Sequence, residues 1–387
     1  MFGSLLFFIA FAVSADCKDF TQRLTRVSEI NSGSFNEEGL AKVARVFADD
    51  FQQIGITLGW DLRTRSLVGE WGSPSATRKI LAVGHLDTVF EPFHPFQKVS
   101  RTGDRLRGPG VADAKGGVVL MRDVIRDTSD LVKSGKLQWK IFIAGDEEIG
   151  SRYSKEKLIQ MAKTADWALV FEPGWFDLAL NRPRVPASIG GNIQISLAIQ
   201  APESHSGASL RQGVGALDTA AWVVTELGTL RSPSVSMNFY ESHHKSKPNV
   251  AGGQAELKLS VRYETDEEGA RIRERLSELK RKAKERDQVE LHWKERTVWT
   301  PQVLSDPKLV KLWQAAYREE GLPEPIPSVS LTRSASSFLA LAGVKVLDSC
   351  GPYGSGYHSD VEEVWLESVD LRRRLLTKLV GSLVLTP

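Results

Sequence analysis

The feature that most constrains this fold is a series of short apolar runs separated by segments with helical periodicity. The runs have the length of β-strands, and the segments between them repeat apolar residues as on one face of a helix. Strands that alternate with helices are typical of a largely parallel sheet covered by helices on both faces. We therefore predict an α/β fold, with strands at 66–68, 80–83, 139–144 and 167–171 and helices at 118–124 and 155–163.

Two further helices are expected before the first strand. Apolar residues of the first, Phe20, Leu24 and Val27, recur at helical spacing. The second is expected to begin at Ser34, because the segment 34–37 has the Ser-x-x-Glu pattern of a capping box.

The length of 387 residues favours two domains. Prolines, arginines and a Gly-Gly pair near 181–191 indicate a boundary. From 192 to 293 the pattern is strand, helix, strand, strand, helix, strand, which suggests an inserted ferredoxin-like α+β module. After about Thr300 the first pattern returns. The predicted parts are a signal peptide (1–15), a first catalytic part (16–187), an inserted dimerisation or lid domain (188–300) and a second catalytic part (301–387).

The N-terminus has the pattern of an export signal. Leu5–Val13 is apolar but too short to span a bilayer, and Val13-Ser14-Ala15 offers small residues to a signal peptidase. The segment lacks Lys and Arg, so a membrane-tethering or buried first helix is the alternative. We predict an exported protein, periplasmic or secreted, with no membrane attachment after cleavage.

The net charge bears on the kind of binding partner, and the cysteine content bears on disulfide formation. A net charge of +2 argues against nucleic acid, and the basic stretch 271–286 has the interleaved acids and apolar spacing of a solvated amphipathic helix. The sequence holds two cysteines, Cys17 and Cys350. Whether they pair is left open, because pairing depends on their distance in the fold.

Ionisable residues follow several predicted strands. The carboxyl ends of strands in an open α/β sheet form its ligand crevice. An imidazole and several carboxylates in one crevice are typical ligands of a divalent metal. Singly, each has an ordinary explanation, such as a turn aspartate or a surface histidine, but together their order favours a metal site. The candidates are His85, Asp87, Glu147, Glu148 and Glu172, with Asp113 in a glycine-rich loop and His358 after a later strand.

Spacing suggests how neighbouring candidates divide their work. His85 and Asp87 lie two apart, so on an extended segment they share a face, and one can ligate while the other orients it. Glu147 and Glu148 are adjacent and point apart, so that one can face the metal and the other a bound water.

The ordered motifs GHLDTV, GPGVADAKGG, DEEIGS, FEP, HSG and YHSD resemble those of a di-zinc family of amidohydrolases and carboxypeptidases. That family includes glutamate carboxypeptidase (carboxypeptidase G), aminoacylases and succinyl-diaminopimelate desuccinylase. The resemblance extends over nearly the whole chain after the signal. It implies a zinc-peptidase-like fold, a homodimer and two Zn²⁺ ions, with Co²⁺ or Mn²⁺ as other divalent metals.

The resemblance also implies a ligand set. Asp113 would bridge the two metals and would be followed by a cis peptide bond. Glu148 and His358 would complete one metal site, and His85 and Glu172 the other.

Further roles follow from the same resemblance. Asp87 would orient a ligand histidine, and Glu147 would be the general base that takes a proton from water and passes it to the leaving amine. His205, from the partner subunit, would donate to the oxyanion of the intermediate. Asn249 and Arg262 match positions that hold the substrate carboxylate; without the resemblance, Arg262 would be read as a strand surface residue.

The chain departs from the family pattern at one place. Many members carry Gly-Gly-Thr-Asp ahead of the last zinc histidine, where this chain has Thr332-Arg333-Ser334-Ala335. No metal ligand is lost. Arg333 is either a second carboxylate clamp, which would favour an acidic side chain, or a solvated loop residue.

The predicted function is hydrolysis of an amide bond next to a free carboxylate, with release of C-terminal glutamate. The substrate is a small peptide or an N-acyl amino acid. An aminoacylase or deacylase of N-acyl amino acids is one alternative. A catalytically inactive metal-binding paralogue is another, but the presence of Glu147 argues against it.

Overall fold

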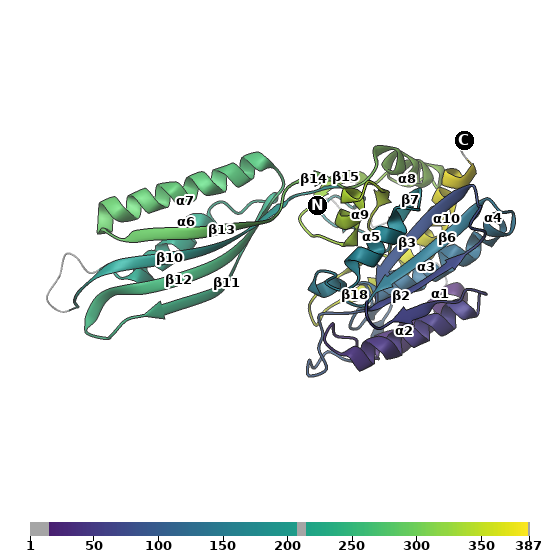
Figure 1. Ribbon diagram of the computed structural model, residues 1–387, viewed down its shortest axis with the longest axis horizontal. Coiled ribbons are helices and arrows are strands. Elements are labelled where there is room, and N and C mark those ends of the chain that lie inside the picture. The colour runs from purple at the N-terminus through teal and green to yellow at the C-terminus, as the bar shows by residue number, and fades with distance from the viewer. Residues whose placement is uncertain (1–14, 207–213, 386–387) are drawn as a thin grey trace, which may run out of the picture. The chain divides into compact units, whose positions relative to one another are not determined.

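The computed structural model describes residues 15–206 and 214–385, which form two compact units (Figure 1). Unit 1 comprises the chain up to Ala187, Leu304–Ser328 and the chain from Ser334 onward. Unit 2 comprises Ser188–Val303 and Val329–Arg333. The expected signal peptide lies outside the described residues, apart from Ala15.

Unit 1 is built around a six-stranded sheet of order β1-β2-β6-β3-β7-β16. The last four strands of that order are parallel to one another. Strand β2 is antiparallel to both of its neighbours, β1 and β6. The mostly parallel sheet agrees with the predicted α/β class. Its strands are β1 (Gly59–Asp61), β2 (Ser66–Trp71), β3 (Arg78–His85), β6 (Leu137–Ala144), β7 (Trp167–Val170) and β16 (Lys345–Leu347).

Alternation along β3 explains why helices cover both faces of this sheet. Ile80 and Ala82 join one apolar cluster, whereas Leu81 and Val83 join another. Successive strand residues point to opposite faces, so an all-apolar strand must be covered on both. The first cluster includes α1 (Ala15–Ser28), α2 (Glu37–Gln52), α3 (Lys115–Asp127), α4 (Ser129–Lys133), α8 (Pro307–Glu319) and α10 (Glu367–Leu385), and the second α5 (Lys155–Ala162) and α9 (Ala335–Leu341).

The predicted start of the second helix was wrong by three residues. Helix α2 begins at Glu37, and its N-cap is Asn36, whose side chain accepts a hydrogen bond of 3.0 Å from the N–H of Gly39. The hydroxyl of Ser34 instead donates to Asp87 at 2.7 Å. The hydroxyl of Ser34, which the local pattern assigned to the helix cap, is therefore used in a contact with a residue distant in sequence.

Short strands outside the central sheet join distant parts of the chain. A small sheet of order β17-β18-β5-β4 pairs Glu363 with Arg107. Elsewhere β8 pairs with β9, and Gln302 of β14 pairs with Ile189 of β9. The bounds are β4 (Ser100–Thr102), β5 (Arg105–Arg107), β8 (Phe176–Asp177), β9 (Arg182–Ile189), β14 (Gln302–Val303), β15 (Ile326–Ser330), β17 (Gly354–Ser355), β18 (Glu363–Trp365) and the 3₁₀ turn η1 (Glu147–Ile149).

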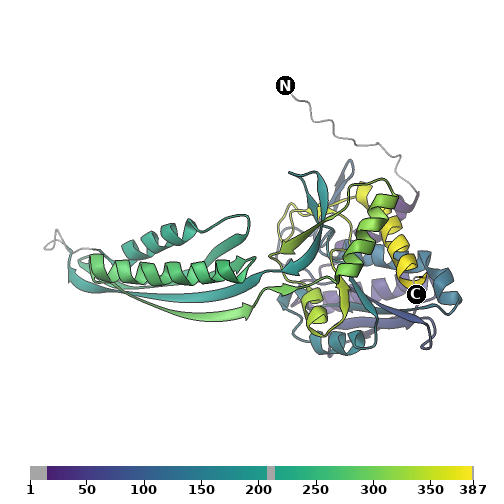
Figure 2. The same ribbon diagram turned by 90° about the horizontal axis from the view of Figure 1, so that it is seen from above.

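Unit 2 is a four-stranded antiparallel sheet of order β11-β12-β10-β13, with both of its helices on one face (Figures 1 and 2). Its strand and helix order is that of a ferredoxin-like module. The basic helix buries Ile272, Leu276, Leu279 and Ala283. The elements are β10 (Gly191–His205), α6 (Ala216–Gly228), β11 (Val235–Lys245), β12 (Val250–Tyr263), α7 (Asp266–Asp287) and β13 (Glu290–Trp299).

The described residues answer whether the two cysteines pair and whether a described helix could cross a membrane. Cys17 and Cys350 are both buried, and no disulfide joins them. Among the helices of the described part of the chain, none has the length and apolar character needed to cross a membrane.

Candidate metal centre

Three strands of the unit 1 sheet deliver ionisable side chains at their carboxyl ends. His85 is the last residue of β3, Glu147 and Glu148 follow β6, and Glu172 follows β7. These strands are parallel neighbours, so their carboxyl ends lie at one edge of the sheet. That edge is where open α/β sheets bind ligands.

The carboxylate of Asp113 lies between two histidines. Its Oδ1 is 3.1 Å from Nε2 of His85, and its Oδ2 is 3.2 Å from Nε2 of His358. The peptide bond from Asp113 to Ala114 is cis, as the family resemblance implies. A carboxylate that presents one oxygen to each of two imidazoles has the geometry of a bridging ligand.

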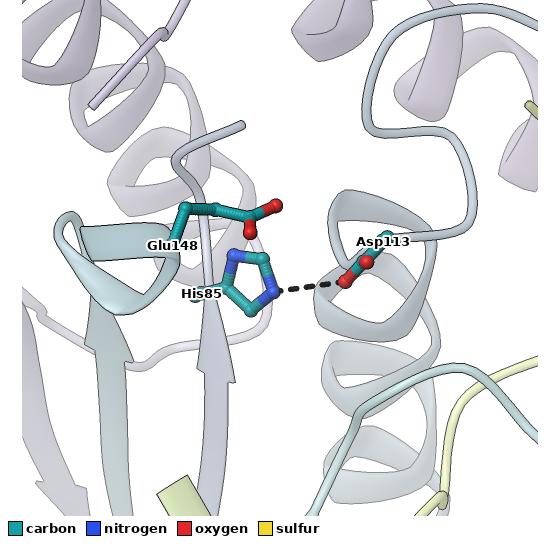
Figure 3. Close-up of side chains that lie close together, drawn as sticks. All are labelled: His85, Asp113 and Glu148. Carbon is teal, nitrogen blue, oxygen red and sulfur yellow. Dashed lines mark hydrogen bonds and ion pairs between the residues drawn. The ribbon is translucent and has the colours of Figure 1, made fainter. Parts of the chain in front are cut away.

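Each histidine also faces one glutamate. Nε2 of His85 lies 3.6 Å from Oε2 of Glu172, and Nε2 of His358 lies 3.1 Å from Oε2 of Glu148. Ligand atoms of His85, Asp113 and Glu148 lie within 4.8 Å of one another, and Figure 3 shows the imidazole pointing toward the aspartate. All five predicted ligands thus form one continuous cluster.

Asp87 contacts both His85 and the turn that carries Glu147 and Glu148. Its Oδ1 is 3.3 Å from Nδ1 of His85, whose other close neighbour is the main-chain oxygen of Asp87 at 3.1 Å. The same carboxylate accepts hydrogen bonds of 3.1 Å from the N–H groups of Glu147 and Glu148, and one from Ser34. Asp87 is fully buried. One side chain therefore orients a histidine and fixes the turn that carries two acids.

Mutual proximity shifts the pKa values of these groups. The carboxylates of Asp113 and Glu148 raise the pKa of His358 to about 10. Burial raises the pKa of Glu172 to about 7, and burial with the charge of Glu172 holds the pKa of Glu147 well above its usual value. Carboxylates so closely packed need positive charge among them, which the imidazole of His358, with a pKa of about 10, can supply in the metal-free protein.

Glu362 is a residue of this site that the sequence patterns did not indicate. This side chain is 1% exposed and accepts hydrogen bonds from the N–H groups of Gly110, Ala112 and Asp113. Nothing in the sequence distinguishes it from Glu363, because the pairing of β5 with β18 that brings it to the Asp113 loop joins residues about 250 positions apart.

The predicted residues of unit 2 fall into two groups. His205 ends β10, and Asn249 precedes β12; the main-chain oxygen of Asn249 accepts from the N–H of Ser206 at 3.1 Å. Arg262 lies near the opposite end of β12. At about 3.3 Å per residue, the 13 positions from Asn249 to Arg262 span on the order of 40 Å. The two cannot hold one carboxylate within a single chain.

Arg262 and Arg333 both lie near Leu331. The guanidinium of Arg262 donates to the main-chain oxygen of Leu331 at 3.0 Å. That of Arg333 lies over the ring of Trp299, 5.0 Å from its centroid. Both side chains are half-buried, and burial lowers the pKa of each.

Ala335, which stands in place of the family aspartate, is a buried residue at the start of α9. The hydroxyl groups beside it are bound to a different acid: Ser334 and Ser336 donate to the carboxylate of Asp348 at 2.7 and 2.6 Å. Asp348 directly follows β16 and is buried, and burial raises its pKa.

The donor set fits two divalent cations. Two imidazoles and three carboxylates, one of them shared, match the ligands that paired metals use. Together with a hydroxide, the three carboxylates would balance the charge of the cations. An α/β sheet with this cluster at its carboxyl edge defines the class of metal-dependent hydrolases.

The family model for Peptidase family M20/M25/M40 matches residues 81–382, and the chain belongs to this family. It is therefore a metal-dependent hydrolase of the carboxypeptidase and amidohydrolase type. The chain is 26% identical over 374 residues to carboxypeptidase G2 of Pseudomonas sp. (strain RS-16), covering 93% of this chain and 88% of that protein.

Solved structures share the fold. A tripeptidase of Staphylococcus aureus matches with a TM-score of 0.71 and 17% identity, covering 95% of this chain and 98% of the other. A dinuclear metal binding peptidase of Bacillus subtilis matches with a TM-score of 0.67 and 12% identity, covering 96% and 100%. At these identities the likeness concerns the fold alone.

Proposed function

We propose that this chain is an exported di-zinc peptidase that cleaves an amide bond next to a free carboxylate and releases C-terminal glutamate. The observation that carries the proposal is the position of Asp113, with one oxygen toward His85 and the other toward His358. A cluster built for one metal would not need a shared carboxylate between two separate imidazoles.

The five clustered residues divide into two ligand pairs around the bridge. His85 and Glu172 would hold one Zn²⁺ with Asp113, and Glu148 and His358 the other. Co²⁺ or Mn²⁺ could take the same places, since all accept oxygen and imidazole ligands. Bound there, the cations would polarise the scissile carbonyl and make water more acidic.

Glu147 is the residue that moves the proton in this proposal. Its main chain is fixed by Asp87, while its neighbour Glu148 faces His358. Glu147 accepts the proton of the attacking water and delivers it to the nitrogen of the leaving amine. Asp87 keeps Nδ1 of His85 engaged, so that Nε2 is the nitrogen presented to the metal.

Arg262 and Arg333 are the proposed recognition residues for the released amino acid. A guanidinium binds a carboxylate with two parallel hydrogen bonds. We assign Arg262 to the main-chain carboxylate of the substrate and Arg333 to the acidic side chain. The stacking of Arg333 on Trp299 supports this assignment, because it restricts the guanidinium to one direction.

The separation of residues along β12 supports a homodimer. His205 and Asn249 lie at one end of the unit 2 sheet and Arg262 near the other. If His205 stabilises the oxyanion and Asn249 helps to hold the carboxylate bound by Arg262, they must come from a second copy. We propose that unit 2 forms this dimer and that each active site receives the two residues from its partner.

Export is proposed from the sequence pattern of residues 1–15. The first described helix, α1, begins at Ala15, and its residues Phe20, Leu24 and Val27 are fully buried. Cleavage after Ala15 would leave these core residues in place. The mass of the protein recovered from its native host tests this point, since the mature chain is expected to begin at Asp16.

Release of free amino acid from a panel of N-acyl and dipeptide substrates tests the function. Zinc-dependent release that favours C-terminal glutamate and stops with a chelator supports the proposal. Zinc-dependent release that favours apolar N-acyl amino acids would move the chain to the aminoacylases. No release from any substrate, with two metals bound, would identify an inactive paralogue.

A further inference from the structure

Glu362 is a buried acid that the mechanism above does not use. Its Oε1 accepts hydrogen bonds from the N–H groups of Ala112 and Asp113 at 3.0 and 3.1 Å, and its Oε2 accepts from Gly110 at 3.2 Å. One carboxylate thus binds three amides of the loop that carries the bridging aspartate.

The main chain of Glu362 belongs to the turn that carries His358. Its N–H donates to the carbonyl oxygen of Ser359 at 3.1 Å, and Ser359 in turn donates to Gly356 at 3.2 Å. The carbonyl oxygen of Glu362 accepts from the N–H of Gly108 at 3.2 Å. Glu362 therefore contacts the Asp113 loop with both its main chain and its side chain, while it is itself part of the His358 turn.

The small sheet of unit 1 sets this contact. Strand β5 ends at Arg107, and β18 begins at Glu363, and these two residues are paired in register. Glu362 and Gly108 are the next residues outward from that pair. The contacts of Glu362 therefore directly continue the pairing of β5 with β18. They join the Asp113 loop to the His358 turn next to the end of this small sheet.

We propose that Glu362 is a positioning residue that locks the Asp113 loop to the His358 turn and so fixes the separation of two ligands of the same metal. The inference rests on the proposed metal ligation. It concerns one metal more than the other, because His358 is a proposed ligand only of the site that Glu148 completes, whereas the ligands of the other site are His85, which ends strand β3, and Glu172, which follows strand β7. Residues that orient ligands typically contribute 10- to 100-fold to metal affinity.

The test substitutes Glu362→Gln in the full chain. The amide keeps the size of the side chain but turns one acceptor into a donor that faces an N–H group. The matched control is Glu363→Gln, the same change one residue later, where the carboxylate is bound by Ser355 and lies 3.5 Å from Arg105. Metal-free protein is titrated with Co²⁺ in competition with a chelator, and the visible spectrum of each equivalent is recorded.

We expect Glu362→Gln to weaken one of the two Co²⁺ equivalents by about 10- to 100-fold and to change its spectrum. The other equivalent, and both equivalents of Glu363→Gln, should match the wild type. Unchanged binding in Glu362→Gln, or equal weakening of both equivalents, would overturn the inference. Binding of two Co²⁺ ions by the wild type tests the proposed ligand set separately. A wrong ligand set can therefore be distinguished from a wrong role for Glu362.

A second measurement covers the case in which Glu362→Gln does not fold. Hydrogen exchange of the metal-free wild type reports on the amides of Ala112 and Asp113 directly. If Glu362 holds the Asp113 loop in the absence of metal, these amides should be protected from exchange before any cation is added. Rapid exchange that slows only on metal addition would contradict the inference, since the metal and not Glu362 would then order the loop.

Discussion

Oδ1 of Asp87 lies 3.3 Å from Nδ1 of His85, and the same carboxylate accepts hydrogen bonds from the N–H groups of Glu147 and Glu148. The residue that orients the histidine thus also fixes the turn bearing Glu147 and Glu148. One carboxylate therefore contacts His85, Glu147 and Glu148, to which we assign the roles of metal ligand, general base and second metal ligand. Its loss should affect both metal binding and catalysis.

Asp87→Asn tests this double role. The amide would direct a donor at one of the N–H or O–H groups that now donate to the carboxylate. We expect metal affinity and kcat/KM each to fall by about 10- to 100-fold. Ser34→Ala removes one of the same hydrogen bonds and leaves the charge, so it should have a smaller effect. Wild-type metal affinity together with wild-type kcat in Asp87→Asn would refute the role.

Metal binding should release protons near neutral pH. The pKa of His358 in the metal-free protein is about 10, so its imidazole is protonated at pH 7. A proton and a metal compete for the same nitrogen, so apparent metal affinity should rise with pH between about 7 and 10. Calorimetry in buffers of different ionisation enthalpy counts the protons. His358→Asn should release fewer than the wild type, and an equal count would show that His358 does not titrate as described.

Arg333 should determine side-chain preference without affecting the metals. Arg333→Gly removes the proposed clamp, and we expect kcat/KM for C-terminal glutamate to fall by about 10-fold or more, as for the loss of a charged hydrogen bond. C-terminal alanine substrates should be cleaved as by the wild type. Arg333→Lys keeps the charge but not the planar fork, and should rescue only in part. An equal loss for both substrates would argue against a role in specificity.

Mixing two variants that we expect to be inactive tests the proposed sharing of active-site residues between two subunits. His205→Ala lacks the proposed oxyanion donor, and Glu147→Gln lacks the base. A mixed dimer would hold one intact site, with His205 from the Glu147→Gln chain. After subunit exchange, random pairing should restore about a quarter of wild-type activity. Activity that stays at the level of the separate variants would mean that His205 acts within its own chain or not at all.

The sequence predicted the central sheet well because its strands are locally encoded. The run from Leu81 to Val83 is apolar at every position, as a strand buried on both faces must be, and the ionisable residue at its end is adjacent in sequence. The α/β class and the positions of His85, Glu148 and Glu172 at strand ends followed from such local patterns. The family resemblance supplied their assignment to two metals.

What the sequence could not predict depends on contacts between distant segments. Glu362 and Glu363 are chemically identical neighbours, yet only the first lies against the Asp113 loop, because strands of three residues pair across some 250 positions. Ser34 looked like a helix cap, but Asp87, 53 residues later, takes its hydroxyl. Strands as short and polar as β5 carry no periodicity from which either contact could be inferred.

The most direct test of the central claim is the Glu147→Gln variant, with metal content and hydrolysis measured on the same sample. We expect two zinc ions per chain, as in the wild type, and a fall in kcat of about 10²- to 10⁴-fold, because the amide cannot accept the proton of the attacking water. The control Glu156→Gln, at an exposed position of α5, should keep both metals and full activity. Full hydrolysis by Glu147→Gln with two zinc ions bound would show that Glu147 is not the general base.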